Sequence, residues 1–167
     1  MVIVVMGTTG AGKTTVGELL AERLGWIFAD ADDFHPQSNV EKMKAGIPLD
    51  DTDRAPWLQS LRDAISAWLD RGENTVLACS ALRRSYREVL RPGPEVTFVY
   101  LKGSYEVIEK RVLARRGHFA KADLLKSQFE TLEEPSPDEP AILVDVDQRP
   151  EAIVQDAIAL LGLQARL

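Results

Sequence analysis

Five short apolar runs recur along the chain, at residues 2–6, 26–29, 75–80, 96–101 and 141–146. All of them are rich in β-branched or aromatic residues, and none alternates cleanly between apolar and polar positions. Parallel strands that are covered on both faces have this uninterrupted pattern. We therefore predict that these runs form a buried parallel sheet.

Helical periodicity fills the intervals between the runs. One apolar stripe at residues 16–24 ends at Gly25, and a longer stripe at residues 57–69 ends at Gly72. Glycine just after the last apolar position is typical of a helix C-cap. Shorter stripes follow the third, fourth and fifth runs. Strands alternating with helices predict an α/β fold, a doubly wound five-stranded parallel sheet with ligands outside the carboxyl ends of the strands.

Two segments interrupt this alternation. Residues 35–56 precede the long helical stripe and include a short helical pattern at about 37–45. Residues 116–140 precede the last run and end in the proline-rich acidic sequence EEPSPDEP. A chain of 167 residues is long enough for one well-buried core. We predict a single domain, residues 1–167, with a substrate-binding insertion at about 35–56 and a lid at about 116–140.

Composition and charge disfavour several classes of partner. Hydrophobic residues make up 45% of the chain, and 20 basic against 26 acidic side chains give a net charge of −6. This balance disfavours nucleic acid and anionic membranes as partners, so a bound anion needs a local basic cluster. The single cysteine, Cys79, cannot form an internal disulfide, and no 18-residue apolar stretch or signal-peptide pattern occurs. We expect a cytoplasmic protein.

The sequence GTTGAGKT at residues 7–14 matches the P-loop pattern G-x-x-x-x-G-K-[ST] at every fixed position. It follows a predicted strand and precedes a predicted helix, which is the required context. Lys13 is expected to neutralise the β- and γ-phosphates of ATP, and the Thr14 hydroxyl to hold Mg²⁺. The predicted nucleotide-binding residues are Gly7, Thr8, Thr9, Gly10, Ala11, Gly12, Lys13, Thr14 and Thr15.

Missing motifs narrow the class of P-loop protein. The N-K-x-D and D-x-x-G motifs of regulatory GTPases do not occur, and the third run ends in Cys79-Ser80 where larger ATPases have an acidic pair. The sequence AILVDVD at residues 141–147 resembles a Walker B strand, but small P-loop kinases place the loop after their last strand beside the adenine. A small kinase is therefore favoured, and a non-catalytic nucleotide-binding module remains as the alternative.

Acidic residues follow the second run. Asp30 and Asp32 share one side if this segment is extended, so both carboxylates would face the crevice beyond the sheet. We predict that Asp30 serves the metal and that Asp32 orients or deprotonates the acceptor hydroxyl. The alternative is an acidic turn in which Asp33 caps a helix. For His35, a substrate contact and a turn-stabilising role are equally favoured.

Two groups of arginines complete the predicted site. Arg83 and Arg87 are four residues apart, so on a helix they would share a face and could bind the carboxylate of an anionic acceptor. Arg111 and Arg115 share a face leading to Gly117, which predicts a lid that swings an arginine over the transferred phosphate. Solvated basic faces, or a basic helix C-terminus, are the alternatives.

Longer segments resemble one family, the gluconate kinases. The most specific of them are H-P-x-x-N-x-x-K-M at 35–43, D-R-x-P-W-L at 53–58, and G-H-F followed by S-Q-F-E-T-L-E at 117–133. The resemblance covers nearly the whole chain. It implies a fold like that of nucleoside-monophosphate and shikimate kinases, and phosphorylation of D-gluconate at its 6-hydroxyl by ATP with Mg²⁺ in a homodimeric enzyme.

The resemblance also implies residue roles. It places the acceptor at Asp32, His35, Arg54, Arg83 and Arg87, and the lid arginine at Arg111 or Arg115. A related shikimate kinase is the alternative enzyme, although that family has a glycine-rich turn where this chain has residues 79–82.

Overall fold

The computed structural model describes residues 1–114 and 119–166. It contains a parallel sheet with the strand order β2-β3-β1-β4-β5. The α/β prediction is confirmed, and each strand begins within one residue of the start of a predicted run. The bounds are β1 Val2–Met6, β2 Ile27–Asp30, β3 Thr75–Ala78, β4 Val96–Lys102 and β5 Ala141–Asp145.

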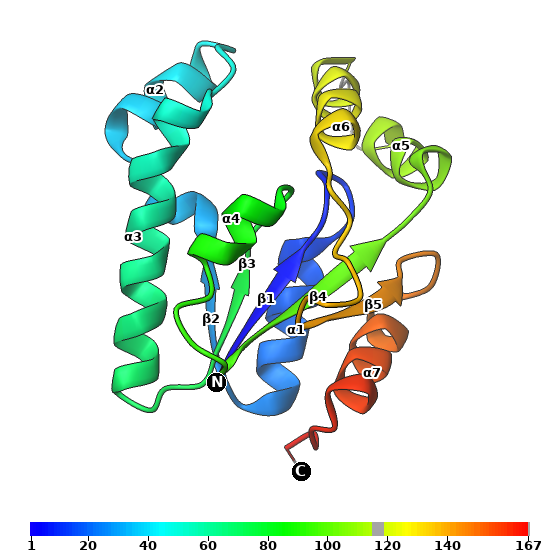
Figure 1. Ribbon diagram of the computed structural model, residues 1–167. Helices are drawn as coiled ribbons and strands as arrows, with labels where there is room; N and C mark the ends of the chain where they lie inside the picture. The colour runs from blue at the N-terminus through cyan, green and yellow to red at the C-terminus, as the bar shows by residue number, and fades with distance from the viewer. Residues whose placement is uncertain (115–118, 167) are drawn as a thin grey trace.

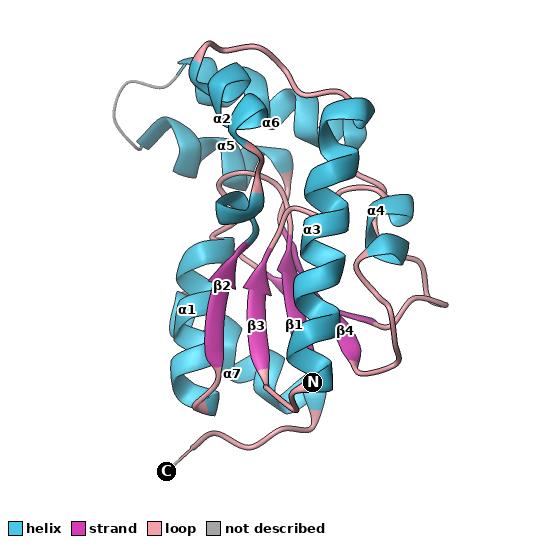
Figure 2. Cartoon of the chain, turned by 90° about the vertical axis from the view of Figure 1, so that its left-hand side faces the viewer, coloured by secondary structure: helices cyan, strands magenta, loops and turns pink. Residues whose placement is uncertain are grey.

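Helices cover both faces of the sheet (Figures 1 and 2). One apolar core joins the strands to α1, α5 and α7, and a second core on the other face joins them to α3 and α4. The described helices are α1 Lys13–Leu24, the 3₁₀ helix η1 Ala31–Phe34, α2 Gln37–Lys44, α3 Asp51–Asp70, α4 Arg84–Val89, α5 Tyr105–Ala114, α6 Phe119–Thr131 and α7 Pro150–Leu161.

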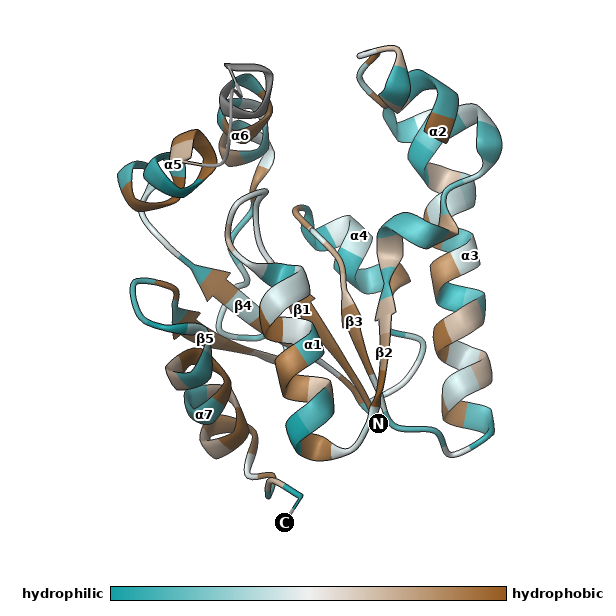
Figure 3. Cartoon of the chain, turned by 180° about the vertical axis from the view of Figure 1, so that it is seen from behind, coloured by the Kyte–Doolittle hydropathy of each residue, from teal (hydrophilic) through white to brown (hydrophobic). Residues whose placement is uncertain are grey.

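Hydropathy follows this layering (Figure 3). The central strands are hydrophobic, and β1 is buried at every position, because it lies between two strands and under helices on both faces. By contrast, α2 is largely hydrophilic, in keeping with its position beyond the sheet. Within the described residues, no helix is long and apolar enough to cross a membrane.

The helix α3 begins earlier than its apolar stripe. Asp50 accepts a hydrogen bond from the backbone N–H of Asp53, and the Asp53 carboxylate accepts one from the backbone N–H of Asp50. This reciprocal capping box satisfies backbone donors that the first helical turn leaves free. Pro56 lies within the first two turns of the helix. The cap therefore extends α3 into the segment predicted as the insertion. This first part of α3 and the helix α2 lie beyond the carboxyl ends of the strands (Figure 1).

Candidate active site

The phosphate loop connects β1 to α1, as predicted. Gly12 is the N-cap of α1 with φ 90°, and it offers no side chain to cap the helix. The N–H groups of the first turn are therefore available to a bound anion, which the helix dipole also favours. Gly10 has φ 78°, and a Cβ there would lie 2.5 Å from Cγ2 of Val112 in α5. Glycine is thus required at residue 10 by both backbone angle and packing.

Lys13 lies across the loop. Its Nζ donates to the carbonyl oxygen of Thr8 at 3.0 Å. Burial lowers the pKa of Lys13, while the charges of Asp32 and Asp30 act in the opposite direction. The ammonium group therefore lies between the phosphate loop and the carboxylates at the end of β2, where a terminal phosphate would meet an acceptor.

Asp30 and Asp32 are brought together by a turn. β2 ends at Asp30, and residues 31–34 form η1, so Asp32 does not belong to an extended segment. Instead, Asp30 Oδ1 accepts a hydrogen bond from the backbone N–H of Asp32 at 3.0 Å and caps η1. The predicted extended conformation of residues 30–32 was wrong. The alternative in which Asp33 caps a helix was also wrong, because Asp30 is the cap of η1.

Asp30 also contacts the phosphate loop. Thr14 Oγ1 donates to Asp30 Oδ2 at 3.3 Å, so the predicted metal ligands lie side by side. Magnesium is usually held by one or two carboxylates together with phosphates and water, and this pair fits that donor set. In residues 1–114 and 119–166, no group of three or more His, Cys, Asp or Glu side chains could hold a metal alone. An ion here would therefore depend on the nucleotide.

Asp32 has the electrostatics of a proton acceptor. Although Asp32 is exposed to solvent, desolvation by the surrounding protein raises the pKa of its side chain, and the charge of Asp30 raises it further. His35 and Lys13 act in the opposite direction. A carboxylate with a raised pKa accepts a proton more readily than an ordinary surface aspartate.

His35 is held on both ring face and ring edge. It stacks on Trp57 with the centroids 4.4 Å apart, and Trp57 Nε1 donates to the carbonyl oxygen of Ala31 at 2.7 Å. Asn39 Nδ2 donates to the Asp53 carbonyl oxygen at 2.8 Å and lies 3.2 Å from His35 Nδ1. Because a carbonyl only accepts, this contact assigns the amide orientation, and His35 Nδ1 is then an acceptor and Nε2 a donor.

Arg54 and Arg83 converge on Tyr86. Each guanidinium carbon lies 5.9 Å from the centre of the tyrosine ring. The Tyr86 hydroxyl donates to Asp51 at 2.7 Å, and Asp51 lies 3.7 Å from Arg54 and 3.6 Å from Arg83. The side chains of Arg54 and Arg83 are 31% and 42% exposed, so both guanidinium groups remain accessible to a ligand. The charge of Arg54 also lowers the pKa of His35, so this cluster lies near the residues predicted to bind the acceptor.

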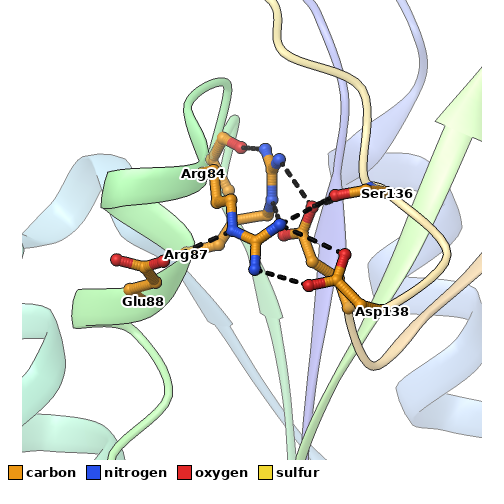
Figure 4. A network of polar contacts seen from close by, with 7 residues as sticks. Arg84, Arg87, Glu88, Ser136 and Asp138 are labelled. Carbon is orange, nitrogen blue, oxygen red and sulfur yellow. Dashed lines mark hydrogen bonds and ion pairs between the residues drawn. The ribbon is translucent and has the colours of Figure 1, made fainter.

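Two other arginines of this segment, Arg84 and Arg87, pair with acidic side chains of the protein (Figure 4). Arg83 is the N-cap of α4, so it does not share a helix face with Arg87 as predicted. Arg87 is 2% exposed, and its Nε and Nη2 donate to the two carboxylate oxygens of Glu139 at 2.7 and 3.2 Å. Arg84 pairs with Asp138 at 2.7 Å. The predicted substrate contact by Arg87 is corrected: this guanidinium is already occupied by the protein.

The helix α6, which lies in the segment predicted as a lid, contacts the phosphate loop. Gln128 Oε1 accepts a hydrogen bond from the backbone N–H of Thr9 at 2.6 Å. Arg111, one of the two predicted lid arginines, donates instead to the carbonyl oxygen of Val146, just after β5. Arg115 lies outside the described residues. The structure thus directs Arg111 toward the loop after the last strand.

Sequence reasoning missed several residues of this site. Asn39 and Gln128 belong to the segments that resemble gluconate kinases, but no chemistry was assigned to them. Asn39 lies four residues after His35, a spacing that indicates contact if both flank a helix turn. Tyr86 was interpreted as part of an apolar stripe, and Asp51 gave no signal, because their hydrogen bond joins residues 35 positions apart.

Comparisons with known proteins agree with this fold. A family model described as shikimate kinase matches residues 9–161. The thermoresistant gluconokinase of Escherichia coli K12 is 46% identical over 162 residues, which cover 96% of this chain and 93% of that protein. The crystal structure of a sugar kinase from Janibacter sp. HTCC2649 has a TM-score of 0.89 at 47% identity, covering 97% and 94% of the two chains. A gluconokinase structure from Sinorhizobium meliloti 1021 has a TM-score of 0.84 at 46% identity, covering 96% and 90%.

Proposed function

The chain belongs to the gluconokinase family, and we propose that it transfers the terminal phosphoryl group of ATP to the 6-hydroxyl of D-gluconate, giving 6-phospho-D-gluconate and ADP. The observation that supports this most directly is the 46% identity to a gluconokinase over 96% of the chain. The site agrees with this chemistry, because Thr14 of the phosphate loop contacts Asp30, and the accessible Arg54 lies close enough to His35 to act on its pKa.

The phosphate loop supplies the donor side. Residues 7–15 would surround the phosphates, with the free backbone N–H groups of the first turn of α1 directed at them, and Lys13 would neutralise the charge that develops on the transferred group. Arg111 fits the base end of the nucleotide better than the phosphate end, because its guanidinium donates to Val146 in the loop that follows β5. We keep Arg115 as the candidate for the transferred phosphate.

The residues after β2 supply the acceptor side. Asp32 would accept a hydrogen bond from the 6-hydroxyl and align it with the terminal phosphate, and its raised pKa suits it to take the proton as the oxygen–phosphorus bond forms. His35 Nε2 would donate to another hydroxyl of the sugar acid. A phosphoryl transfer of this kind depends mainly on positioning, so small displacements of these groups reduce the rate.

Arg54 and Arg83 would bind the gluconate carboxylate. Both are accessible, both lie against Tyr86, and the single carboxylate of Asp51 does not neutralise two guanidinium groups. A planar guanidinium can bind a carboxylate through two parallel hydrogen bonds. In a chain with a net charge of −6, such a local pair is what attracts an anionic substrate.

Three further properties belong to the proposal. Thr14 and Asp30 would hold Mg²⁺, which when bound offsets phosphate charge. Resemblance to the family supports a homodimer. The lone cysteine, which is buried, supports a cytoplasmic location.

A coupled assay of ADP release tests the function. Gluconate, shikimate, AMP and other sugar acids would be compared as acceptors, and we expect rapid turnover on gluconate. Turnover on shikimate or AMP without turnover on gluconate would replace the proposed substrate. Tight ATP binding without transfer to any acceptor would indicate a regulatory nucleotide-binding module.

A further inference from the structure

The loop between β3 and α4, residues 79–83, is tied to two other parts of the site. The carbonyl oxygen of Ser80 accepts a hydrogen bond from the N–H of Gly7, the first residue of the phosphate loop, at 3.3 Å. The carbonyl oxygen of Leu82 accepts one from the N–H of Glu133, which follows the lid helix, at 2.7 Å. The loop therefore lies between the nucleotide site and the end of the lid.

Ala81, between these two carbonyls, has a strained backbone. Its φ is +46°, and in the described part of the chain it is the only residue other than glycine with a positive φ. The left-handed region costs a residue with a Cβ about 1 kcal/mol, so surrounding contacts must maintain it. Ala81 is 2% exposed, and its carbonyl oxygen accepts a hydrogen bond from Nη1 of Arg87 at 2.8 Å.

Arg87 is itself held from the opposite side. Glu139 binds the guanidinium through both carboxylate oxygens and is only 7% exposed. The same carboxylate accepts hydrogen bonds from the backbone N–H of Ser136 at 2.8 Å and from its hydroxyl at 3.2 Å. The Arg87 guanidinium thus joins the segment between α6 and β5 to the carbonyl oxygen of Ala81, the residue with the strained backbone (Figure 4).

We propose that Arg87 and Glu139 are positioning residues of the acceptor site, which hold Ala81 in its left-handed conformation and thereby set the position of Arg83. Arg83 follows Ala81 by two residues and caps α4 directly after the loop. If Ala81 relaxed to a negative φ, the chain direction into Arg83 would change, and the guanidinium would leave its place beside Tyr86. The role of Arg83 in binding the acceptor rests on the proposed function.

The conservative variant Arg87→Lys tests this arrangement. Lysine keeps the charge opposite Glu139, but one ammonium group cannot reproduce the two-pronged contact and also reach the Ala81 carbonyl. We expect the KM for the acceptor to rise about 10-fold or more, because a small displacement in a binding site has effects of this size. The KM for ATP should change less than about twofold.

A second substitution separates positioning from simple stability. Glycine adopts positive φ without strain, so Ala81→Gly in the Arg87→Lys background should recover much of the acceptor KM. Arg84→Lys is the matched control, because Arg84 bonds to the same segment through an exposed pair with Asp138 and should leave both KM values unchanged. If Arg87→Lys does not fold, Glu139→Asp keeps the charge but draws the guanidinium away, and the same glycine rescue applies.

The outcomes are distinct. A raised acceptor KM that Ala81→Gly reverses supports the proposal. An acceptor KM that stays at the wild-type value while Tm falls means that the Arg87–Glu139 pair only stabilises the fold. A raised acceptor KM that Ala81→Gly does not reverse indicates direct substrate contact. Either result overturns the proposal. All ratios are measured on whichever acceptor the wild-type enzyme phosphorylates, so failure of gluconate as a substrate would be recognised separately.

Discussion

Gln128 of α6 accepts a hydrogen bond from the backbone N–H of Thr9 at 2.6 Å, joining residues 119 positions apart. This N–H belongs to the loop that would surround the phosphates, so the position of α6 is linked to the nucleotide site. Gln128 is partly buried. If the phosphate loop binds ATP as proposed, this contact places α6 next to the nucleotide.

Gln128→Ala should weaken the use of ATP. Loss of a single hydrogen bond is worth about 0.5–1.5 kcal/mol, so kcat/KM for ATP should fall about 2- to 13-fold in steady-state kinetics. Gln128→Glu should be worse, because it adds a negative charge beside the phosphates. Lys126→Ala, exposed on the same helix, is the control. Wild-type kinetics in Gln128→Glu would contradict a position close to the nucleotide.

Lys13→Ala should nearly abolish transfer. Removing one group that stabilises transition-state charge costs about 10²–10³-fold in kcat. Burial lowers the pKa of Lys13, which means that the folded protein disfavours its charge, so Tm should not fall substantially. Single-turnover kinetics and a thermal melt check the two parts. A kcat near that of the wild type would disprove the P-loop assignment.

Asp32→Asn should reduce activity and slightly stabilise the fold. Folding raises the pKa of Asp32, so at neutral pH its ionised form opposes folding, and asparagine should raise Tm by a small amount, because solvent screens this exposed side chain. The gain should disappear as pH falls through the raised pKa toward the ordinary value of 3.8, where the carboxyl becomes neutral in both states. We expect kcat to fall more than ATP binding weakens.

Thermal melts from pH 7 to pH 3.5 and the kinetics of Asp33→Asn, whose side chain is exposed nearby, provide the comparison. If Asp32→Asn changes only the affinity for ATP, Asp32 belongs to the metal side of the site.

His35 should remain neutral at a lower pH than a free histidine. Burial lowers its pKa and the charge of Arg54 lowers it further, whereas Asp32 raises it. This histidine therefore favours folding above its unfolded pKa of about 6.5, and that contribution is lost as pH falls toward the folded value. Asn39→Asp places a carboxylate against Nδ1 of His35 and should raise the pKa of this histidine.

An NMR titration of the imidazole checks this shift. The chain has two histidines, so a His118→Gln background assigns the His35 signal. In Asn39→Asp, the KM for gluconate should become pH-dependent over the range in which His35 titrates. An unchanged titration would mean that Asn39 does not determine the tautomer.

Cys79 should resist alkylation in the native protein. It is 2% exposed, and burial raises its pKa to about 12, so almost no thiolate is present at pH 8. Labelling with iodoacetamide should be at least about 10³-fold slower than in urea, because it requires unfolding. ATP and gluconate together should slow it further by stabilising the folded state. The labelling is measured by mass spectrometry. Rapid labelling of the native protein would show local opening at the end of β3.

The sequence by itself determined the layered α/β architecture and the place of the phosphate loop. Burial on both faces of a parallel strand leaves an uninterrupted apolar run, and a helix leaves a 3.6-residue period, so both patterns are local. The P-loop is also local, because its glycines, Lys13 and Thr14 lie within eight consecutive positions. These features needed no knowledge of distant contacts.

Only the tertiary structure decided which charged groups remain available for a substrate. Arg83 and Arg87 are equivalent in sequence, but the carboxylate of Glu139, 52 positions after Arg87, occupies one of them and leaves the other accessible. Likewise, Asp30 and Asp32 meet through a capping turn that the apolar pattern did not indicate. A long-range ion pair or a side-chain cap forms according to which groups the fold brings together, and sequence spacing does not specify it.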